Sequence, residues 1–121
     1  MARKKGLEGN VSFRVADAHN LPFEDEIFDV VIVECTTGIL DKERAFREFI
    51  CVLKSGGYIG DLEIIWKKEP PEELVERVYK LWGGFRTMTL DGWRRFFRSQ
   101  GLVEVKAVDF SDEIPRYGKG I

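Results

Sequence analysis

The sequence has few cysteines, no long apolar run and almost no net charge, and each of these scarcities excludes a class of protein. Its longest apolar stretches, such as Val30–Val33, fall far short of the roughly 20 residues that a membrane-spanning helix needs. The chain does not open with the pattern of a secretory signal peptide, in which a basic segment is followed by an apolar one. Cys35 and Cys51 belong to no Cys-x-x-Cys or Cys/His cluster, which predicts reduced, structural cysteines and no metal site. We therefore expect a cytoplasmic protein without a membrane partner.

The net charge of the chain argues against nucleic-acid binding. The formal net charge is −2, although 33% of the residues are charged. A domain that binds nucleic acid mainly neutralises phosphates and is usually basic, so we expect no nucleic-acid partner. Arg94, Arg95 and Arg98 share the outward side of an expected helix, a pattern that is typical of a solvated helix face.

The length of 121 residues and the 44% hydrophobic content predict one domain over residues 1–121. Apolar alternation and apolar runs predict strands, and the run Phe28–Val33 suits a strand that is buried on both faces of a parallel sheet. Apolar residues at helical spacing between caps and Gly-Gly stops predict helices. The expected strands are Val11–Ala16, Phe28–Val33, Tyr58–Trp66 and Val103–Phe110, and the expected helices span 41–54, 70–82 and 89–100, with 2–7 as the end of another helix and 111–121 irregular.

Strands that alternate with amphipathic helices favour an α/β layer fold with a mainly parallel sheet, in which ligands bind at the carboxyl ends of the strands. Within this order stands the run Val15-Ala16-Asp17-Ala18-His19-Asn20-Leu21-Pro22-Phe23, followed by an acidic turn and Phe28-Asp29-Val30-Val31-Ile32. This pattern resembles the middle motifs of class I S-adenosylmethionine-dependent methyltransferases of the ubiquinone-biosynthesis type. Residues 44–48 and the Leu-Lys-x-Gly-Gly turn at 53–57 are similar to later motifs of the same family, so the resemblance spans about residues 2–110.

The resemblance implies a partial Rossmann-like methyltransferase fold, with a mostly parallel sheet flanked by helices. The family's first two strands and the Gly-rich loop that holds its cofactor have no counterpart before Val11. Its antiparallel last strand has none after Phe110. We therefore expect a domain that lacks those two strands and binds S-adenosylmethionine weakly or not at all by itself.

The resemblance also implies candidate cofactor contacts. The carboxylate of Asp17 would accept a hydrogen bond from the adenine amino group, the backbone N–H of Ala18 would reach the ring, and Leu21 or Phe23 would pack near the base. Glu34 opens the polar loop 34–37, which corresponds to the segment that lines the methionine end and the substrate pocket. The alternative, that Asp17 forms a turn and Leu21 belongs to the core, stays open at this point.

No acid, base or metal is compulsory for methyl transfer from a sulfonium, because the protein's main task is to hold the two reactants in line. The catalytic residues are therefore unknown from the sequence. Glu34 and Glu63 are possible substrate-facing carboxylates and His19 is a possible general base. For each of these three residues a solvated or structural role is the stronger interpretation.

Three functions remain open for the chain. The first is methyl transfer to a small molecule, carried out with a second polypeptide or a further segment that supplies the cofactor loop. The second is a non-catalytic domain that keeps the fold as an interaction module. The third is another α/β domain, such as a flavodoxin-like regulator. We also expect a homodimer, or a partner chain that completes the sheet, because Phe28–Val33 would otherwise lie at an open edge and Val11–Ala16 would lack a neighbouring strand.

Overall fold

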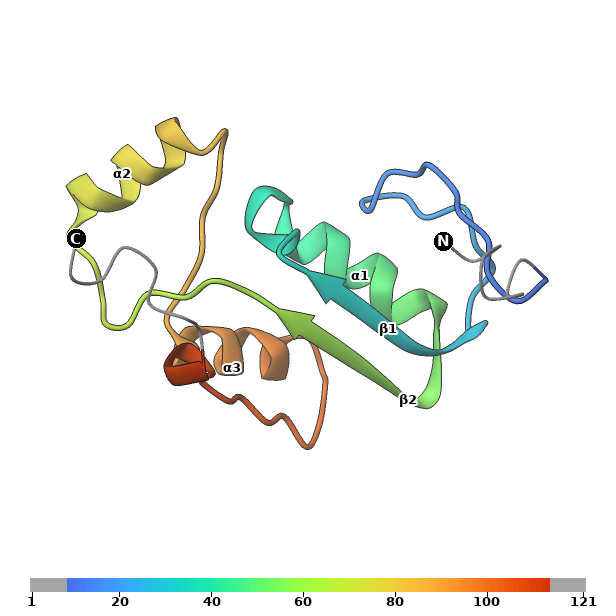
Figure 1. Cartoon of the computed structure of the whole chain (residues 1–121). Coiled ribbons are helices and arrows are strands. Elements are labelled where there is room, and N and C mark those ends of the chain that lie inside the picture. The colour runs from blue at the N-terminus through green and yellow to red at the C-terminus, as the bar shows by residue number, and fades with distance from the viewer. Residues whose placement is uncertain (1–8, 114–121) are drawn as a thin grey trace.

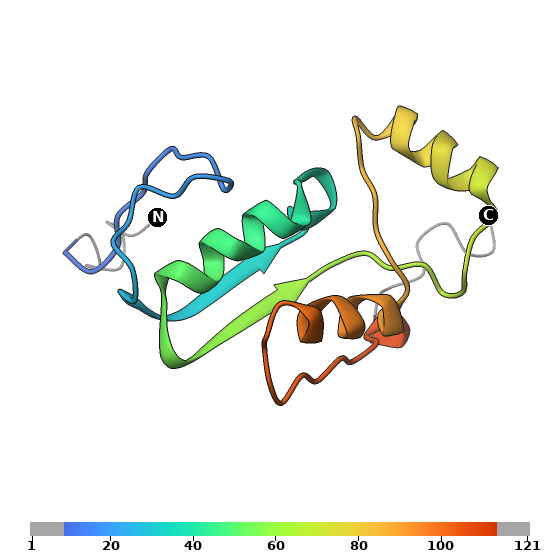
Figure 2. The same ribbon diagram turned by 180° about the vertical axis from the view of Figure 1, so that it is seen from behind.

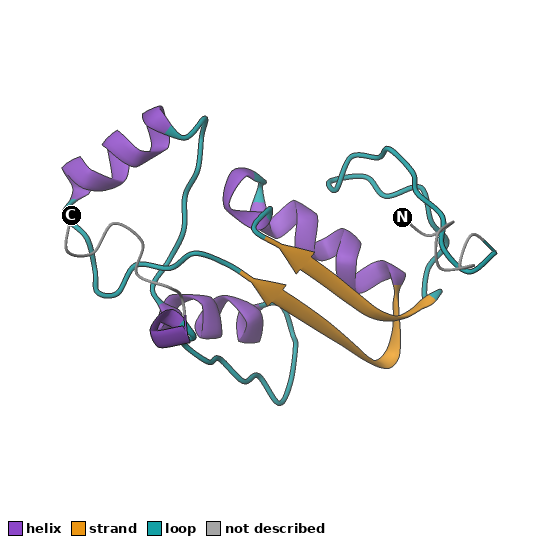
Figure 3. Cartoon of the chain, in the orientation of Figure 1, coloured by secondary structure: helices purple, strands orange, loops and turns teal. Residues whose placement is uncertain are grey.

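A computed structural model of the chain describes residues 9–113. Figures 1 and 3 show a short sheet, two helices that pack beside it and a third helix that stands apart. The predicted α/β class is confirmed. The predicted helix end at 2–7 and most of the irregular tail lie outside the described residues. The elements are β1 (Phe28–Glu34), η2 (Thr37–Ile39), α1 (Lys42–Val52), β2 (Leu53–Leu62), α2 (Glu72–Leu81), α3 (Leu90–Ser99) and η3 (Ser111–Glu113).

The sheet of the described residues consists of β1 and β2, which pair in parallel. Val31 is paired with Ile59 and Val33 with Asp61, and the register is irregular between Phe28 and Val30. Parallel neighbours need a crossover connection, and α1 supplies it. Because the two strands run in the same direction, their carboxyl ends meet at one edge of the sheet.

Two adjacent glycines permit the irregular start of β2. Gly56 has a φ of 82°, a left-handed conformation that glycine adopts without steric cost. At Gly57, a Cβ atom would lie 2.7 Å from the backbone oxygen of Asp29, so only glycine lets the two strands approach each other this closely. The Gly-Gly pair was expected to stop the helix, but α1 ends earlier, at Val52, and Leu53 is already extended.

The core is built around Phe46 of α1, whose side chain is fully buried. Its ring contacts three other aromatic rings edge to face: Phe49 at a centroid distance of 5.3 Å, and Phe96 and Phe97 of α3 at 5.0 Å each. Val33 of β1 belongs to the same cluster. Helices α1 and α3 therefore cover the same face of the sheet. The rear view in Figure 2 shows α1 lying along β1 and α3 lying along β2.

Capping residues fix where the two packed helices begin. The side chain of Asp41 accepts a hydrogen bond from the backbone N–H of Arg44 at the start of α1. The hydroxyl of Thr89 does the same for the N–H of Gly92 at the start of α3. Each contact satisfies a backbone donor that has no partner inside its helix. Both helix starts agree with the sequence prediction to within one residue.

The expected outer strands are not formed. Residues Val11–Ala16 and Val103–Phe110 make no ladder with β1 or β2, so these two predictions are wrong. All side chains of Val11–Ala16 and most of those of Val103–Phe110 are exposed, and Val15 and Val103 are among the most exposed apolar residues described. Apolar and polar residues do alternate in these segments, as they do in strands. A strand also needs a neighbouring strand that pairs with its backbone N–H and C=O groups, and the alternation carries no information about such a neighbour. The expected strand Tyr58–Trp66 is shifted to Leu53–Leu62.

The second face of the sheet is open. Strand β1 was expected to be buried on both sides, and this expectation is wrong for the face away from α1 and α3. On that face Val30 is 50% exposed, Ile32 70% and Tyr58 of β2 70%. These residues alternate with the inward Val31 and Val33 of β1. The strand is therefore apolar on both sides although the described residues cover only one of them.

Helix α2 carries the apolar stripe that its spacing predicted, but none of its residues is buried. Leu81 and the following Trp82 are largely exposed, and Figure 1 shows the helix projecting away from the sheet. A stripe of this kind normally packs on a core.

None of the helices in residues 9–113 has the length and apolar character that crossing a bilayer requires.

The centre of the core gives a stability prediction. Replacing Phe46 with alanine should lower the free energy of unfolding by about 3–5 kcal/mol, because it removes a fully buried ring and leaves a cavity. Urea denaturation followed by circular dichroism measures this change. Phe13→Ala is the matched control, since Phe13 is 88% exposed and its loss should change stability by less than about 0.5 kcal/mol. Equal effects of the two substitutions would contradict this description of the core.

Candidate functional site

Polar side chains gather at the edge of the sheet where β1 and β2 end. The loop after β1 leads into α1, so the amino end of α1 lies at the same edge as the carboxyl end of β1. Open α/β sheets bind ligands at this edge. Three segments contribute to it: the turn 17–20, the loop 34–37 and the end of β2 at 61–63. We call this region the carboxyl edge.

The first segment is a tight turn from Asp17 to Asn20. The backbone N–H of Asn20 donates to the carbonyl oxygen of Asp17 at 2.9 Å, the bond that closes a β-turn. The Asp17 carboxylate accepts a further hydrogen bond from the backbone N–H of His19 at 2.9 Å, as aspartate commonly does at the start of a turn. Asp17 is therefore a turn-forming residue, as the structural alternative proposed.

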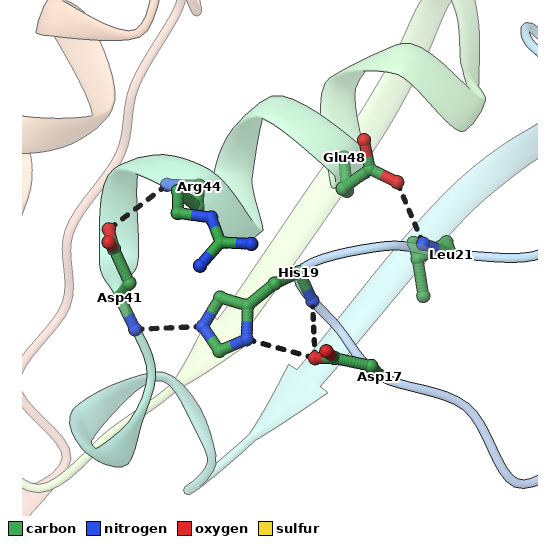
Figure 4. A network of polar contacts seen from close by, with 6 residues as sticks. All are labelled: Asp17, His19, Leu21, Asp41, Arg44 and Glu48. Atoms are coloured by element: carbon green, nitrogen blue, oxygen red, sulfur yellow. Dashed lines mark hydrogen bonds and ion pairs between the residues drawn. The ribbon is translucent and has the colours of Figure 1, made fainter.

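His19 ties this turn to the helix, as Figure 4 shows. The backbone N–H of Asp41 donates to Nε2 of His19 at 2.9 Å, and Nδ1 of the same ring lies 2.9 Å from Oδ1 of Asp17. An N–H can only donate, so Nε2 is the accepting nitrogen and Nδ1 carries the hydrogen toward Asp17. Both ring nitrogens are thus engaged. His19 positions the turn and has no free nitrogen for the general-base role considered from the sequence.

The electrostatics of the turn keep Asp17 ionised. Hydrogen bonds from the backbone and side chain of His19 hold the pKa of the Asp17 carboxyl below its ordinary value. Donors that bind the charged form stabilise it. The Asp17 side chain is also 65% exposed. An ionised, accessible carboxylate is an acceptor for an amino or hydroxyl group of a ligand.

The two residues predicted beside Asp17 are partly buried against the core. Ala18 and Leu21 both pack on the cluster around Phe46. The N–H of Leu21 donates to the carboxylate of Glu48 in α1 at 2.7 Å, so its backbone is fixed. Within the described residues no acceptor is found for the N–H of Ala18. The turn thus offers one carboxylate and one backbone donor next to each other, the two groups for which the family resemblance implies contacts with adenine.

The second segment starts at Glu34, the last residue of β1, whose side chain is exposed. The next residue, Cys35, has a φ of 50°, a conformation that is uncommon outside glycine. Its N–H still bonds to the carbonyl of Leu62 at 2.7 Å, so the chain turns sharply while held to β2. Cys35 and Cys51 are free thiols as expected, but both are exposed and neither fills the core.

The third segment contains a carboxyl pair, Asp61 and Glu63. Thr37, which is fully buried, donates its hydroxyl to Asp61 Oδ2 at 3.1 Å and its N–H to Glu63 Oε2 at 3.4 Å. Burial, followed by a hydrogen bond with Glu63 and that residue's charge, raises the pKa of Asp61 to about 8. At neutral pH the pair therefore holds a proton on Asp61. The remaining oxygens, Asp61 Oδ1 and Glu63 Oε1, are buried without a partner among the described residues.

Sequence reasoning considered Glu63 and placed Thr37 in the polar loop 34–37 expected to line the ligand site, but it missed Asp61. Asp61 faces the helices from inside a strand, opposite Val33, where a charged residue is rare unless it is paired. The available signal was the sequence Gly60-Asp61-Leu62-Glu63, which places two carboxylates on one face of a strand. The hydrogen bonds of Thr37 to this pair could not be predicted, because they depend on how the loop 34–37 folds against the end of β2.

A groove of about 450 Å³ runs along β2 on the side away from β1. Its walls are β2 and the extended segment 105–111, and α3 contributes Trp93 and Phe97. Asp61 and Glu63 reach its lining at the carboxyl edge. Cavities of this size with mainly apolar walls and a few polar groups are typical of small-molecule sites.

The family model and the sequence relatives of this chain agree on one family. A family model described as "Methyltransferase domain" matches residues 1–83. Two "Ubiquinone/menaquinone biosynthesis C-methyltransferase UbiE" proteins are similar to this chain. The one from Vibrio parahaemolyticus serotype O3:K6 is 38% identical over 78 residues, which cover 64% of this chain and 29% of the relative. The one from Shewanella woodyi is 36% identical over 87 residues, which cover 71% of this chain and 33% of the relative. The chain thus spans about a third of the length of these relatives.

Two solved structures resemble the fold. The [4+2]-cyclase SpnF superimposes with a TM-score of 0.68 and 28% identity, and covers 83% of this chain and 35% of its own length. The MccD protein gives a TM-score of 0.69 and 26% identity, with 81% and 44% covered. One of these neighbours is titled a cyclase, so the fold by itself does not determine a reaction.

The carboxyl pair gives a prediction about pH. Unfolded Asp61 has its ordinary pKa of 3.8 and folded Asp61 one of about 8. Between these values the folded chain binds a proton that the unfolded chain lacks, so stability should fall as pH rises from about 4 to 8. Asp61→Asn cannot ionise and still accepts from Thr37, so its melting temperature should fall less over this range. Asp25→Asn, in an exposed loop, is the control. Parallel melting curves for wild type and Asp61→Asn would contradict the raised pKa.

Proposed function

The chain belongs to the methyltransferase domain family, and on this premise we propose that it transfers a methyl group from S-adenosylmethionine to a small-molecule acceptor. In this proposal, a second polypeptide or a further segment supplies the Gly-rich cofactor loop. The proposed location is the cytoplasm. The observation that supports it most directly is the turn 17–20, where the family's adenine motif coincides with an ionised carboxylate beside a backbone donor that has no acceptor among residues 9–113.

The residues present fit one end of the cofactor. Asp17 offers a carboxylate that can accept from the adenine amino group, and the N–H of Ala18 can donate to a ring nitrogen. Leu21 packs on the core directly after the turn and holds that backbone in place. When bound, S-adenosylmethionine supplies an electrophilic methyl group on sulfur. The chain's own contribution is to orient the adenine end through His19 and the amino end of α1.

The loop 34–37 would face the reacting end of the cofactor. Glu34 is exposed at the end of β1, and Thr37 is held to Asp61 and Glu63. Side chains at this point of a parallel sheet line the ligand crevice. Holding the acceptor against the methyl group in line is the main catalytic requirement, so we assign these residues to positioning and none to acid or base catalysis.

The second candidate, a non-catalytic interaction module, is favoured by the open apolar face of the sheet and the exposed stripe of α2. A surface of this kind commonly marks a contact with another polypeptide. The two candidates differ in their dependence on the cofactor. A methyltransferase binds S-adenosylmethionine once the cofactor loop is supplied, and an interaction module does not.

The 121 residues alone should bind S-adenosylmethionine no more tightly than about the millimolar range. The turn 17–20 can hold only the adenine, and the chain shows no Gly-rich loop between a strand and a helix before Val11. Isothermal titration with the cofactor measures this directly. A dissociation constant in the low micromolar range would contradict this prediction, because it would require cofactor contacts beyond those of the turn 17–20.

Fusing an amino-terminal segment with the family's first strand, Gly-rich loop and second strand should restore binding. In that fusion, Asp17→Ala should weaken binding by about 1–3 kcal/mol, because the adenine amino group loses its acceptor. His19→Ala keeps the carboxylate and loosens the turn, so it should cost less. If Asp17→Ala binds as well as its parent, the adenine assignment is wrong. If His19→Ala costs as much, Asp17 acts only through the shape of the turn.

A further inference from the structure

His19 links the turn 17–20 to the start of α1 through the two nitrogens of its ring. Asp17 and Asp41 stand on opposite sides of this ring, and they come from segments that precede and follow β1 in the sequence. Only 20% of the His19 side chain is exposed, whereas that of Asp17 is 65% exposed. Figure 4 shows the ring between its two partners. The ring is therefore an enclosed link, and the carboxylate beyond it remains accessible to a ligand.

The two partners of the ring require opposite chemistry. The ionised carboxylate of Asp17 only accepts hydrogen bonds, and the backbone N–H of Asp41 only donates. Among the neutral and cationic forms of histidine, only the neutral form with its hydrogen on Nδ1 satisfies both partners. The neutral form with its hydrogen on Nε2 satisfies neither. The cation keeps its bond to Asp17 but turns a second N–H toward the N–H of Asp41, so that contact is lost.

Protonation therefore affects the two sides of His19 differently. The bond to Asp17 lies within the turn and gains a charge, so it persists as an ion pair. The bond from Asp41 joins the turn to the helix start, and its two ends are 22 residues apart in the sequence. Asp41 is exposed, so water can accept from its N–H once the ring no longer does. The nearby bond from the N–H of Leu21 to Glu48 of α1 is unaffected, which confines the release to the turn.

We propose that His19 is a positioning residue that makes adenine capture by Asp17 depend on pH. The neutral ring holds the turn in place, and the cation releases it. The part that concerns adenine rests on the proposed function. Both hydrogen bonds from His19 go to Oδ1 of Asp17, which leaves Oδ2 to accept from the adenine amino group. A cationic ring offsets the charge of this carboxylate and a released turn orients it less well, so adenine capture weakens as the pH falls.

The charged groups that surround His19 in the described residues come from the turn and from the start of α1. Hydrogen bonds from His19 lower the pKa of Asp17, and the charge of Arg44 lowers it further, so this carboxyl stays ionised. Arg44 keeps its own charge, and its backbone N–H occupies the carboxylate of Asp41. Histidine is the side chain that ordinarily changes charge between about pH 5 and 8. Asp61, at the same edge of the sheet, has a pKa of about 8, so the test needs a control that retains it.

Nitrogen-15 NMR of the 121-residue chain can locate the ring proton directly, because His19 is its single histidine. At about pH 7.5 the long-range couplings of the ring should identify the form with hydrogen on Nδ1. As the pH falls to about 5.5, the Asp41 amide signal should shift with the same midpoint as the ring. His19→Gln removes the titrating ring and retains Asp61, so its Asp41 amide should stay constant. A hydrogen on Nε2 at pH 7.5, an Asp41 amide that does not follow the ring, or an equal shift in His19→Gln would overturn the proposal.

Adenosine is the probe for the ligand part. Titrated into the same chain, it should shift the Ala18 amide signal, and its affinity should be about three- to tenfold weaker at pH 5.5 than at pH 7.5, the range that one lost hydrogen bond gives. In His19→Gln the affinity should be the same at both pH values. Equal affinities in the wild type would overturn pH-dependent capture and leave the adenine site intact. If adenosine leaves the Ala18 amide unchanged at both pH values, pH-dependent capture falls together with the adenine assignment, and the ligand-free titration alone decides whether His19 links the turn to α1.

Discussion

The parallel pairing of β1 with β2 is the contact on which the rest of this molecule depends. It requires α1 as a crossover, and α1 brings Phe46 over the strands, where α3 can pack on it. It also brings the carboxyl ends of both strands together. Thr37, from the loop after β1, meets Asp61 and Glu63 of the β2 end only because of this arrangement. One crossover thus produces the core on one face and the candidate site at one edge.

The candidate site holds carboxyl groups in two opposite electrostatic states. Asp17 is exposed and bound by donors, which lower its pKa. Asp61 is largely enclosed beside another carboxyl, which raises it to about 8. The first is an anion that accepts hydrogen bonds, and the second holds a proton at neutral pH. The contrast follows from the environment of each group and not from its residue type.

The sequence predicted the helices well and the strands poorly, for a physical reason. Helix signals are local: the Asp41 and Thr89 caps and the apolar spacing around Phe46 act within one element. A strand forms only beside another strand, so the alternation of Val11–Ala16 could not show that it lacks a neighbour. The motif around Asp17 was identified because its residues are consecutive. Asp61 was missed because its role depends on a loop more than 20 residues earlier in the chain.

Helix α2 shows how unevenly stability is distributed along this chain. None of its residues is buried, whereas α1 contributes four residues to the core. Protection of a backbone amide from solvent exchange depends on the free energy of the smallest opening that exposes it. The amides of α2 can therefore open by local unwinding while the rest of the fold stays intact, whereas those of α1 require the core around Phe46 to come apart. Within the described residues, α2 is therefore expected to open at a lower free energy than the core around α1, and its apolar stripe has no covering element there.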